Sequence, residues 1–499
     1  MLDICKKLFS AWNGAGVKYC HWKSNEHLAE GLDGLTDLDI YVAPEDRETA
    51  ERLLSEAGYL KFNPQKGARY PDVDEWIGFD LDTGRLVHVH QHYTVITGTK
   101  FSKEYVFPID GLLTESRVLD GETEVFISAP EVEIIILYCR IVLKATDRKR
   151  IAPDEDYRRE IDFLKERMDS DAVKANCVLL MGDSGLRFAE LIDKETLDFG
   201  EWSEIYRIAS RWLRKGKKMS AARAKLRKRY FTYRSMWNAA KRKYLHITPI
   251  KRKTPPTGGM SVCFIGADGS GKSTVSIDIK KWLNWKIEAE RFYLGSGDHY
   301  NGIVKRLLAK GKSRGASASV KTASVEPSDK PKAKKKLSLK GRILRFGFNI
   351  LQCIYLRQIA ERSLKELKRA RKYVKKGGIA LFDRFPQNQF EGMYDGPKIR
   401  SRYPDGGIFV RSQARREERA IRKAQSYQPT LLFKLLLPPE ESVRRKPDHT
   451  IEEVAPKAEI TAKLAFDNSE VVDIDATQPY DGELLEIKRR IWSALCGGR

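Results

Sequence analysis

Residues 260–275 read Met-Ser-Val-Cys-Phe-Ile-Gly-Ala-Asp-Gly-Ser-Gly-Lys-Ser-Thr-Val, and this stretch decides the fold of the second half of the chain. The apolar run at 262–265 predicts a buried strand, and residues 272–282 predict an amphipathic helix. Between them, residues 266–273 match the pattern G-x-x-x-x-G-K-[ST], which in a strand–loop–helix context is typical of a phosphate-binding loop, or P-loop. The alternative is a glycine-rich turn that joins a core strand to a core helix by chance.

The residue types of this loop suit the binding of a nucleotide. Glycines let backbone N–H groups turn inward around phosphates, and the helix N-terminus adds its positive dipole end. The ammonium group of Lys272 is expected to reach the β- and γ-phosphates, and the Ser273 hydroxyl is expected to ligate Mg²⁺, so the predicted cofactors are ATP and Mg²⁺. The predicted nucleotide-binding residues of the loop are Gly266, Asp268, Gly269, Ser270, Gly271, Lys272, Ser273 and Thr274.

Length and composition predict a globular protein of two or three domains, and the motifs along the chain make it a multidomain α/β protein. At 499 residues the chain exceeds a single hydrophobic core. It contains no apolar run of the ~18–20 residues that a membrane span needs, and its N-terminus lacks a signal-peptide core. The seven cysteines include no Cys-x-x-Cys pair, which indicates reduced thiols and favours a cytoplasmic protein.

The net charge of +23 predicts anionic partners. The basic residues concentrate at 211–253, 305–345 and 365–376. Nucleotides, nucleic acid and an anionic membrane face are all compatible partners, and peripheral attachment to a membrane would follow from the last. A solvated basic surface is the simpler interpretation of any single run. A dimer is compatible with the sequence.

The first 128 residues predict an α+β domain with two aspartates on one strand. A helix is expected over 2–15, a strand over 17–22 and a further strand within 34–42. Asp37 and Asp39 stand at i and i+2 of the last strand and so share a face. Two carboxylates this close repel each other unless a divalent metal lies between them, so the pair predicts a Mg²⁺ site. The alternative is that Asp37 only caps the strand.

This order of elements resembles the polymerase-β-type nucleotidyltransferase superfamily. The resemblance implies that Asp37 and Asp39, with a third carboxylate on a neighbouring strand, hold metals that activate a nucleotide α-phosphate. Two features depart from the pattern: Lys23-Ser24 replaces the usual Gly-Ser, and the third strand carries histidines instead of the carboxylate. These histidines could complete a metal site, or Asp80 and Asp82 on the preceding strand could supply the oxygen; an inactive domain is the alternative. The histidines are His88, His90 and His92.

Residues 129–246 predict a helical companion with a basic C-terminal helix, followed by a Pro- and Gly-rich linker at 247–259. The basic helix is expected over 202–244. Basic residues with aromatics can bind nucleic acid by phosphate contact and stacking, or lie on an anionic membrane. The alternative is a connecting helix whose aromatics pack inward. The aromatics are Tyr230, Phe231, Tyr233, Trp237 and Tyr244.

Residues 260–499 predict a P-loop domain with a parallel sheet and flanking helices. A second strand is expected at 291–295, and residues 310–336 are expected to form a disordered insertion because they lack apolar bulk. The strand at 379–382 ends in Asp383-Arg384, at the sheet edge where ligands bind in open α/β folds. A helix from residue 438 carries Arg444 and Arg445 in the position of a lid, and a last strand at 471–474 precedes Thr477 and Gln478.

These C-terminal motifs resemble the thymidylate-kinase-like branch of the P-loop kinases. The resemblance implies that Asp268 contacts an acceptor sugar hydroxyl and that Arg384 clamps the acceptor phosphate. It further implies that Asp383 lies near the metal, that Arg444 or Arg445 stabilises the transferring phosphoryl group, and that Thr477-Gln478 borders the adenine. One departure is that Leu294-Gly295-Ser296-Gly297-Asp298 replaces the Arg-Glu-Pro-Gly segment of thymidylate kinases.

The sequence therefore predicts an ATP- and Mg²⁺-dependent kinase acting on a nucleoside monophosphate or related phosphorylated small molecule, in nucleotide metabolism or surface-polysaccharide assembly. The predicted catalytic residues are Lys272, Asp383, Arg384, Arg444 and Arg445, and the predicted metal ligands are Ser273, Asp383, Asp37 and Asp39. Two alternatives stay open. The acceptor could be a polynucleotide end, with the N-terminal domain transferring nucleotides, or the protein could be a non-enzymatic, ATP-gated adaptor on an anionic membrane.

Overall fold

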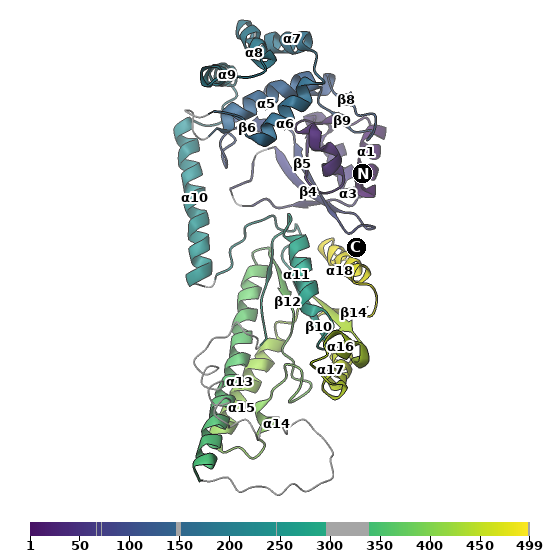
Figure 1. Cartoon of the computed structure of the whole chain (residues 1–499), viewed down its shortest axis with the longest axis vertical. Coiled ribbons are helices and arrows are strands. Elements are labelled where there is room, and N and C mark those ends of the chain that lie inside the picture. The colour runs from purple at the N-terminus through teal and green to yellow at the C-terminus, as the bar shows by residue number, and fades with distance from the viewer. Residues whose placement is uncertain (66, 71, 146–150, 246, 296–338, 498–499) are drawn as a thin grey trace. The chain divides into compact units, whose positions relative to one another are not determined.

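The computed structural model describes residues 1–65, 67–70, 72–145, 151–245, 247–295 and 339–497 (Figure 1). These residues form two compact units, Met1–Pro256 and Thr257–Arg499. The insertion predicted at 310–336 and residues 296–298 lie outside the described residues. Within the part of the chain that is described, no helix combines the length and the apolar character that a bilayer crossing requires. The seven cysteines are free thiols, six of them buried.

The first unit contains a seven-stranded mixed sheet in the order β3-β4-β5-β2-β1-β9-β8. Its strands are β1 Tyr19–His21, β2 Asp37–Val42, β3 Leu60–Phe62, β4 Val73–Phe79, β5 Leu86–His92, β8 Val118–Leu119 and β9 Phe126–Ile127, and β6 Ile96–Thr97 pairs separately with β7 Tyr105–Val106. Three helices belong to the same part of the unit: α1 Asp3–Gly14, α2 Leu28–Leu32 and α3 Arg47–Glu56.

The centre of this sheet is the parallel pair β2 and β5. Asp37 lies opposite His88 in the ladder, and Asp39 lies opposite His90. Between these polar residues, Leu38 and Val89 are fully buried in the core that α1 and α3 cover. Because side chains alternate across a strand, this burial directs the aspartates and histidines together to the opposite face.

Helices complete the first unit and share a core with the sheet. They are α4 Asp110–Glu115, α5 Pro130–Lys144, α6 Glu155–Lys165, α7 Ser170–Met181, α8 Asp183–Asp193, α9 Phe199–Trp212 and α10 Ala221–Tyr244. Helix α5 is buried from Val132 to Leu143. Helix α5 is buried because it lies within one hydrophobic cluster. This cluster also contains Trp22, which follows β1, and Phe188 of α8 and Trp202 of α9.

The single basic helix predicted over 202–244 is wrong, because two helices occupy this stretch. Trp202, Ile205 and Ala209 of α9 are buried in the shared core. Residues 213–220 are not helical and separate α9 from α10. The Ser220 side chain caps α10 by accepting the N–H of Arg223.

Of the five aromatic side chains named above, only one packs inward, as the connecting-helix alternative expected for all of them. Phe231 packs on Phe101 with ring centroids 5.3 Å apart. The remaining four are exposed by 57–70%: Tyr230, Tyr233, Trp237 and Tyr244. Such a helix presents both its charges and its rings to solvent.

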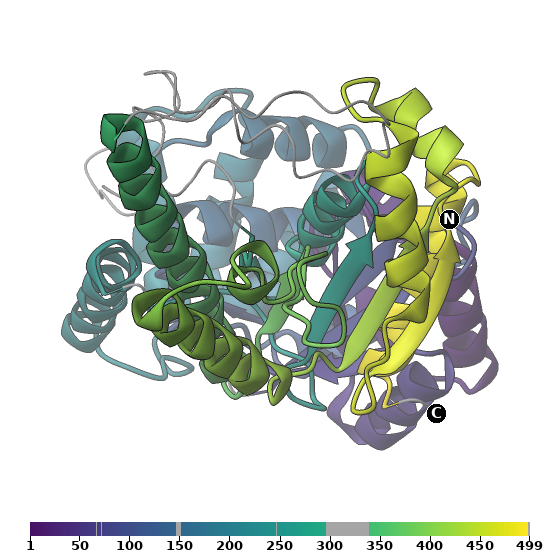
Figure 2. The ribbon, with the colours of Figure 1, turned by 90° about the horizontal axis from the view of Figure 1, so that it is seen from below.

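The second unit contains a five-stranded parallel sheet in the order β11-β12-β10-β13-β14. The strands are β10 Ser261–Gly266, β11 Ala289–Arg291, β12 Ile379–Phe382, β13 Leu431–Leu436 and β14 Glu470–Asp475. The helices are α11 Lys272–Leu283, α13 Leu339–Val374, α14 Ile399–Arg402, α15 Ile408–Gln425, α16 Pro439–Arg445, α17 Ile451–Lys463 and α18 Tyr480–Leu495. In Figure 2 the strands lie between the green helices α13 and α15 and the yellow-green helices α16 and α17.

The predicted strand at 291–295 is shifted in the structure, where β11 ends at Arg291. Helices α15 and α17 were not predicted. The buried face of α15 carries small and polar residues such as Gln413, Glu417 and Ala420, with Ile421 as its one large apolar residue. It therefore offers few large apolar side chains to the stripe by which an amphipathic helix is recognised. This face packs beside α13 near Cys353 and Ala360.

Candidate nucleotide-binding site

The backbone of residues 266–271 requires its three glycines. Gly269 and Gly271 have φ angles of +88° and +86°, in the left-handed region that side chains disfavour. A Cβ on Gly266 would lie 2.3 Å from the Ser270 hydroxyl and 2.8 Å from the carbonyl oxygen of Leu435. Helix α11 begins directly after Gly271, so its first-turn amides and positive dipole end face the loop.

The ammonium group of Lys272 lies inside the loop. It donates to the carbonyl oxygens of Gly266 at 2.8 Å and Ala267 at 2.6 Å. Burial there, together with the nearby positive charge of Arg384, lowers the pKa of Lys272 to about 8. The loop therefore holds a cation whose charged form would gain from an anionic ligand.

Tyr394 supports the start of the loop from a distant turn. Its hydroxyl accepts the N–H of Gly266 at 2.6 Å and donates to the carbonyl oxygen of Gly266 at 2.8 Å. Tyr394 and Asp395 have φ angles of +45° and +60°, which non-glycine residues rarely adopt. The side chain of Gln387 fixes this turn by donating to the carbonyl oxygens of Phe390 and Met393.

Asp383 and Ser273 form a pair of oxygen donors at the ends of β12 and the loop. Asp383 is 5% exposed, and its Oδ2 lies 3.4 Å from the Ser273 hydroxyl and 3.3 Å from the Arg291 guanidinium. Its Oδ1 is buried without a hydrogen-bond partner among the described residues. An unpaired buried carboxylate oxygen beside a hydroxyl fits Mg²⁺, which prefers oxygen ligands.

Arg384 lies on the other side of the strand end. Its guanidinium is 3.7 Å from the carboxylate of Asp395 and remains 38% exposed. Beside it, a cavity of about 120 Å³ opens next to Asp395 and Pro386. Leu294, Tyr355 and Ser363 also line this cavity, and the Ser363 hydroxyl donates to the carbonyl oxygen of Leu294.

Asp268, which the resemblance placed against an acceptor sugar, is engaged by α16 and α17. Its carboxylate lies 2.5 Å from the ammonium group of Lys457, and the Ser442 hydroxyl donates to its backbone carbonyl. Burial opposes the ionised form, but Lys457 outweighs this and holds the pKa of Asp268 below its ordinary value.

The predicted lid and adenine residues form a separate cluster. Arg444 and Arg445 pair with Glu441 at 2.7 Å and 3.0 Å. Arg445 also donates to the carbonyl oxygen of Ala476 at 2.9 Å. Thr477 folds back onto Asp475, and the Gln478 side chain lies 3.5 Å from Glu486. The structure thus brings Lys272, Ser273 and Asp383 together, while these four residues lie around Glu441 and the loop after β14.

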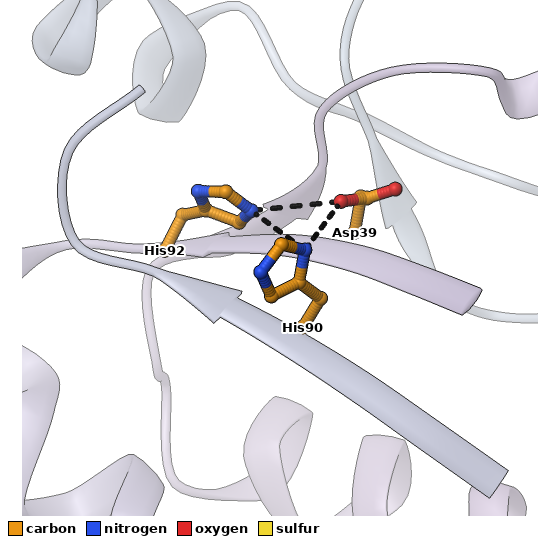
Figure 3. Close-up of side chains that lie close together, drawn as sticks. All are labelled: Asp39, His90 and His92. Carbon is orange, nitrogen blue, oxygen red and sulfur yellow. Dashed lines mark hydrogen bonds and ion pairs between the residues drawn. The ribbon is translucent and has the colours of Figure 1, made fainter. Parts of the chain in front are cut away.

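In the first unit, the two aspartates of β2 turn to different partners. The carboxylate of Asp37 lies 2.8 Å from His88 Nδ1, whereas Asp39 Oδ1 lies 3.1 Å from His90 Nδ1 and 3.5 Å from His92 Nε2 (Figure 3). Among the described residues, the potential metal-binding groups are Asp39 with His90 and His92, and an acidic group of Glu26, Glu133 and Glu160. The two aspartates predicted to share one Mg²⁺ therefore contact different histidines.

The expectation that Asp80 or Asp82 lies on the strand before the histidines is wrong, because β4 ends at Phe79. The Asp80 carboxylate accepts both the N–H and the hydroxyl of Thr83 in the following turn. The carboxylate that faces the histidines is instead Glu75, whose Oε2 lies 2.7 Å from His88 Nε2. Antiparallel pairing sets Glu75 opposite His90. The signal that points to Glu75 is therefore the pairing register of β4 and β5, which places Glu75 on the face that carries the histidines.

Comparison with known proteins gives ATP-binding relatives. No family model matches this chain. The uncharacterized ATP-binding protein YghR of Escherichia coli K12 is 32% identical over 231 residues, covering 45% of this chain and 83% of YghR. The uncharacterized ATP-binding protein YghS of the same organism is 28% identical over 238 residues, covering 47% of this chain and 93% of YghS.

Among solved structures, the chain is similar to a deoxyadenosine kinase from M. mycoides with bound dATP. The sequence identity is 14% and the TM-score is 0.28, with 46% of this chain and 99% of that chain covered. Similarity of this size does not establish a common fold.

Proposed function

The chain belongs to the family of ATP-binding proteins that includes YghR of Escherichia coli, and from this premise we propose that the unit Thr257–Arg499 is an ATP- and Mg²⁺-dependent phosphotransferase. The acceptor is a nucleoside monophosphate or a related phosphorylated small molecule, as in thymidylate-kinase-like enzymes. The reaction serves nucleotide metabolism or surface-polysaccharide assembly.

The observation that carries this proposal is the convergence of three groups at the carboxyl ends of β10 and β12. Lys272 lies inside the glycine loop, the Ser273 hydroxyl lies 3.4 Å from Asp383, and Arg384 follows directly. Ligands of open parallel sheets bind at this edge. A cation, a metal-ligating pair and a second cation in this order suit phosphoryl transfer, in which the protein mainly positions groups and neutralises charge.

Binding of ATP requires Lys272 to exchange its two carbonyl partners for phosphate oxygens. This exchange would leave a buried carbonyl unpaired at Gly266, which costs about 1–3 kcal/mol. Tyr394 avoids this cost, because its hydroxyl already donates to the same oxygen. The loop can therefore release its lysine to the nucleotide while its own backbone stays satisfied.

Ser273 and Asp383 would hold Mg²⁺. When bound, Mg²⁺ neutralises negative charge on the phosphates. Ligation through Oδ2 of Asp383 would exchange the contact of this oxygen with Arg291 for the metal. The unpaired Oδ1 of Asp383 is already available without any such exchange.

The acceptor binds in the cavity beside Arg384 and Asp395. Arg384 clamps its phosphate, and Asp268 contacts its sugar hydroxyl once Lys457 turns from the Asp268 carboxylate to the nucleotide. Arg444 or Arg445 reaches the transferring phosphoryl group when α16 closes and their pairs with Glu441 open, and the closure excludes water. Thr477 and Gln478 border the adenine.

The test is to incubate the full-length protein with ATP, Mg²⁺ and a panel of nucleoside and sugar monophosphates, and to measure ADP and phosphorylated product. Transfer to one class of acceptor is expected, and Lys272→Met should reduce it by at least about a hundredfold. Lys281→Met, on the exposed face of the same helix, is the matched control and should retain activity. Absence of Lys272-dependent product with every acceptor would refute the proposal.

A further inference from the structure

Three nitrogen and oxygen atoms on the polar face of β2 and β5 form a triangle (Figure 3). Asp39 Oδ1 lies 3.1 Å from His90 Nδ1 and 3.5 Å from His92 Nε2, and the two histidine nitrogens are 3.3 Å apart. All three residues stand on paired strands, with Asp39 directly opposite His90 in the ladder. The backbone therefore fixes the triangle independently of any loop.

The dimensions of this triangle fit a face of a tetrahedron around a transition-metal ion. Two ligands at about 2.0–2.1 Å from Zn²⁺ and at the tetrahedral angle are about 3.3–3.4 Å apart. At the right angle of an octahedral Mg²⁺ site with the same bond length, they would be about 2.8–3.0 Å apart. The donor set agrees with this distinction, because imidazole suits Zn²⁺ and its neighbours, whereas Mg²⁺ prefers oxygen.

We propose that Asp39, His90 and His92 bind a Zn²⁺-class divalent ion through three ligands, leaving a fourth position that faces a basic pocket and accepts an anionic group. Three protein ligands with one open position are the arrangement of catalytic zinc sites, whereas structural sites are closed by four. The proposal concerns the unit Met1–Pro256 and does not depend on the phosphotransferase proposed for the other unit.

Neighbouring side chains contact the three proposed ligands and hold them in position. The Lys23 ammonium lies 2.6 Å from Asp39 Oδ2, the carboxylate oxygen that is not part of the triangle. The second nitrogen of His90, Nε2, lies 3.6 Å from Glu75 Oε1. A carboxylate facing the non-ligating nitrogen of a histidine favours the tautomer that offers Nδ1 to a metal. The ring of Trp22 packs edge-on against His92 at 5.3 Å between centroids.

The open side of the triangle faces a cavity of about 40 Å³ with cationic walls. Lys23, Lys103, Arg140 and Lys144 line it together with Tyr70. Arg140 is paired with Glu160 at 2.8 Å and Lys23 with Asp39. Lys144 donates to the Tyr157 hydroxyl. Burial, with the positive charge of Arg140, lowers the pKa of Lys144 to about 6, so an anionic group in the pocket would favour its charged form. An anionic group that ligates the metal would meet these cations.

The experiment uses the full-length protein, stripped with a chelator and titrated with Co²⁺ and Zn²⁺ in the absence of nucleotide. We expect Zn²⁺ to bind with a stoichiometry of one and to displace Co²⁺, and the Co²⁺ form to show the intense visible bands of tetrahedral coordination. His90→Gln and Asp39→Asn should each weaken binding by at least about tenfold. His27→Gln is the matched control and should bind as the wild type does, because His27 is half-exposed and pairs with Glu26 and Glu30, which are not part of the triangle.

Three outcomes would overturn the proposal. They are no binding by the wild-type protein, equal binding by a folded His90→Gln variant, and the weak spectrum of octahedral Co²⁺. Thermal unfolding of each variant without metal separates loss of ligand from loss of fold. The open position is probed with inorganic phosphate, which should shift the Co²⁺ bands in the wild type and less in Lys144→Met. Bands that phosphate leaves unchanged would refute the anion pocket.

Discussion

The hydroxyl of Tyr394 bonds to both polar backbone atoms of Gly266, accepting its N–H at 2.6 Å and donating to its carbonyl oxygen at 2.8 Å. The same carbonyl accepts the ammonium group of Lys272. One distant side chain thus anchors the first residue of the P-loop and shares an acceptor with its lysine. In the proposed mechanism, Tyr394, which is 128 positions away, keeps the Gly266 carbonyl paired when Lys272 turns to ATP.

Removing the Tyr394 hydroxyl should lower both the stability of the unit Thr257–Arg499 and its affinity for nucleotide. Tyr394→Phe keeps the ring but leaves the Gly266 N–H and carbonyl short of a partner, at a cost of about 1–3 kcal/mol. Urea unfolding should report this loss, and calorimetry with a non-hydrolysable ATP analogue should show affinity reduced by about tenfold. Tyr403→Phe, which removes a hydroxyl bonded to Gln352 instead, should leave nucleotide affinity unchanged. Equal ATP affinity in wild type and Tyr394→Phe would contradict the anchor.

ATP affinity should fall at alkaline pH. In the free protein the pKa of Lys272 is lowered to about 8 by burial and by Arg384. Phosphates raise this pKa, so above about pH 8 binding must take up a proton and affinity declines by up to about tenfold per pH unit. Calorimetry in buffers of different ionisation enthalpy measures the uptake.

Lys272→Met is the control for this titration. It should bind ATP weakly and show no proton uptake near pH 8, because the titrating amine is gone. An affinity in the wild-type protein that stays constant from about pH 7 to about pH 9.5 would disprove the linkage.

Asp383→Asn should raise the Mg²⁺ concentration needed for half-maximal transfer by about 10–100-fold. The amide retains the shape of the side chain but loses the charge that attracts the metal, and it also weakens the contact with Arg291. A Mg²⁺ titration at saturating ATP measures the change. Asp405→Asn, on an exposed turn, should match the wild type. Unaltered Mg²⁺ dependence in Asp383→Asn would exclude Asp383 as a ligand.

The first unit should lose stability as the pH rises from about 4.5 to about 7. Burial, with repulsion from Glu160, raises the pKa of Glu133 from its ordinary 4.5 to about 7. The folded state therefore binds more protons than the unfolded state across this pH window. The free energy of unfolding declines with rising pH until Glu133 is ionised in the folded state as well as in the unfolded state.

Glu133→Gln removes this titration. Above pH 7 the variant should be more stable than the wild type, by on the order of 3 kcal/mol at most. Chemical unfolding at a series of pH values measures the difference in unfolding free energy between the variant and the wild type. This difference should become smaller towards pH 4.5. Glu122→Gln, at an exposed position, should follow the wild-type profile. A difference that is independent of pH would show that Glu133 does not titrate in this window.

Local patterns predicted those features that neighbouring residues decide. The strand β10, the glycine turn and the start of α11 follow from residues 260–275, because φ restrictions and hydrogen bonds of that loop are short-range. The histidine strand was also predicted, since a period of two fixes which residues share a face. In contrast, α15 was not predicted, because its buried face carries alanines, Gln413 and Glu417 and only one large apolar residue, Ile421.

The sequence by itself determined the P-loop with the strand β10 before it and the helix α11 after it, because backbone geometry and hydrophobic periodicity are encoded within a few residues. Only the tertiary structure decided which side chains meet across long separations: Tyr394 at Gly266, Lys457 at Asp268, and Glu75 beside His88. It also divided Asp37 from Asp39, giving each its own histidines. These pairings depend on strand register and helix packing, which bury some charges and leave others exposed, and no local pattern specifies them.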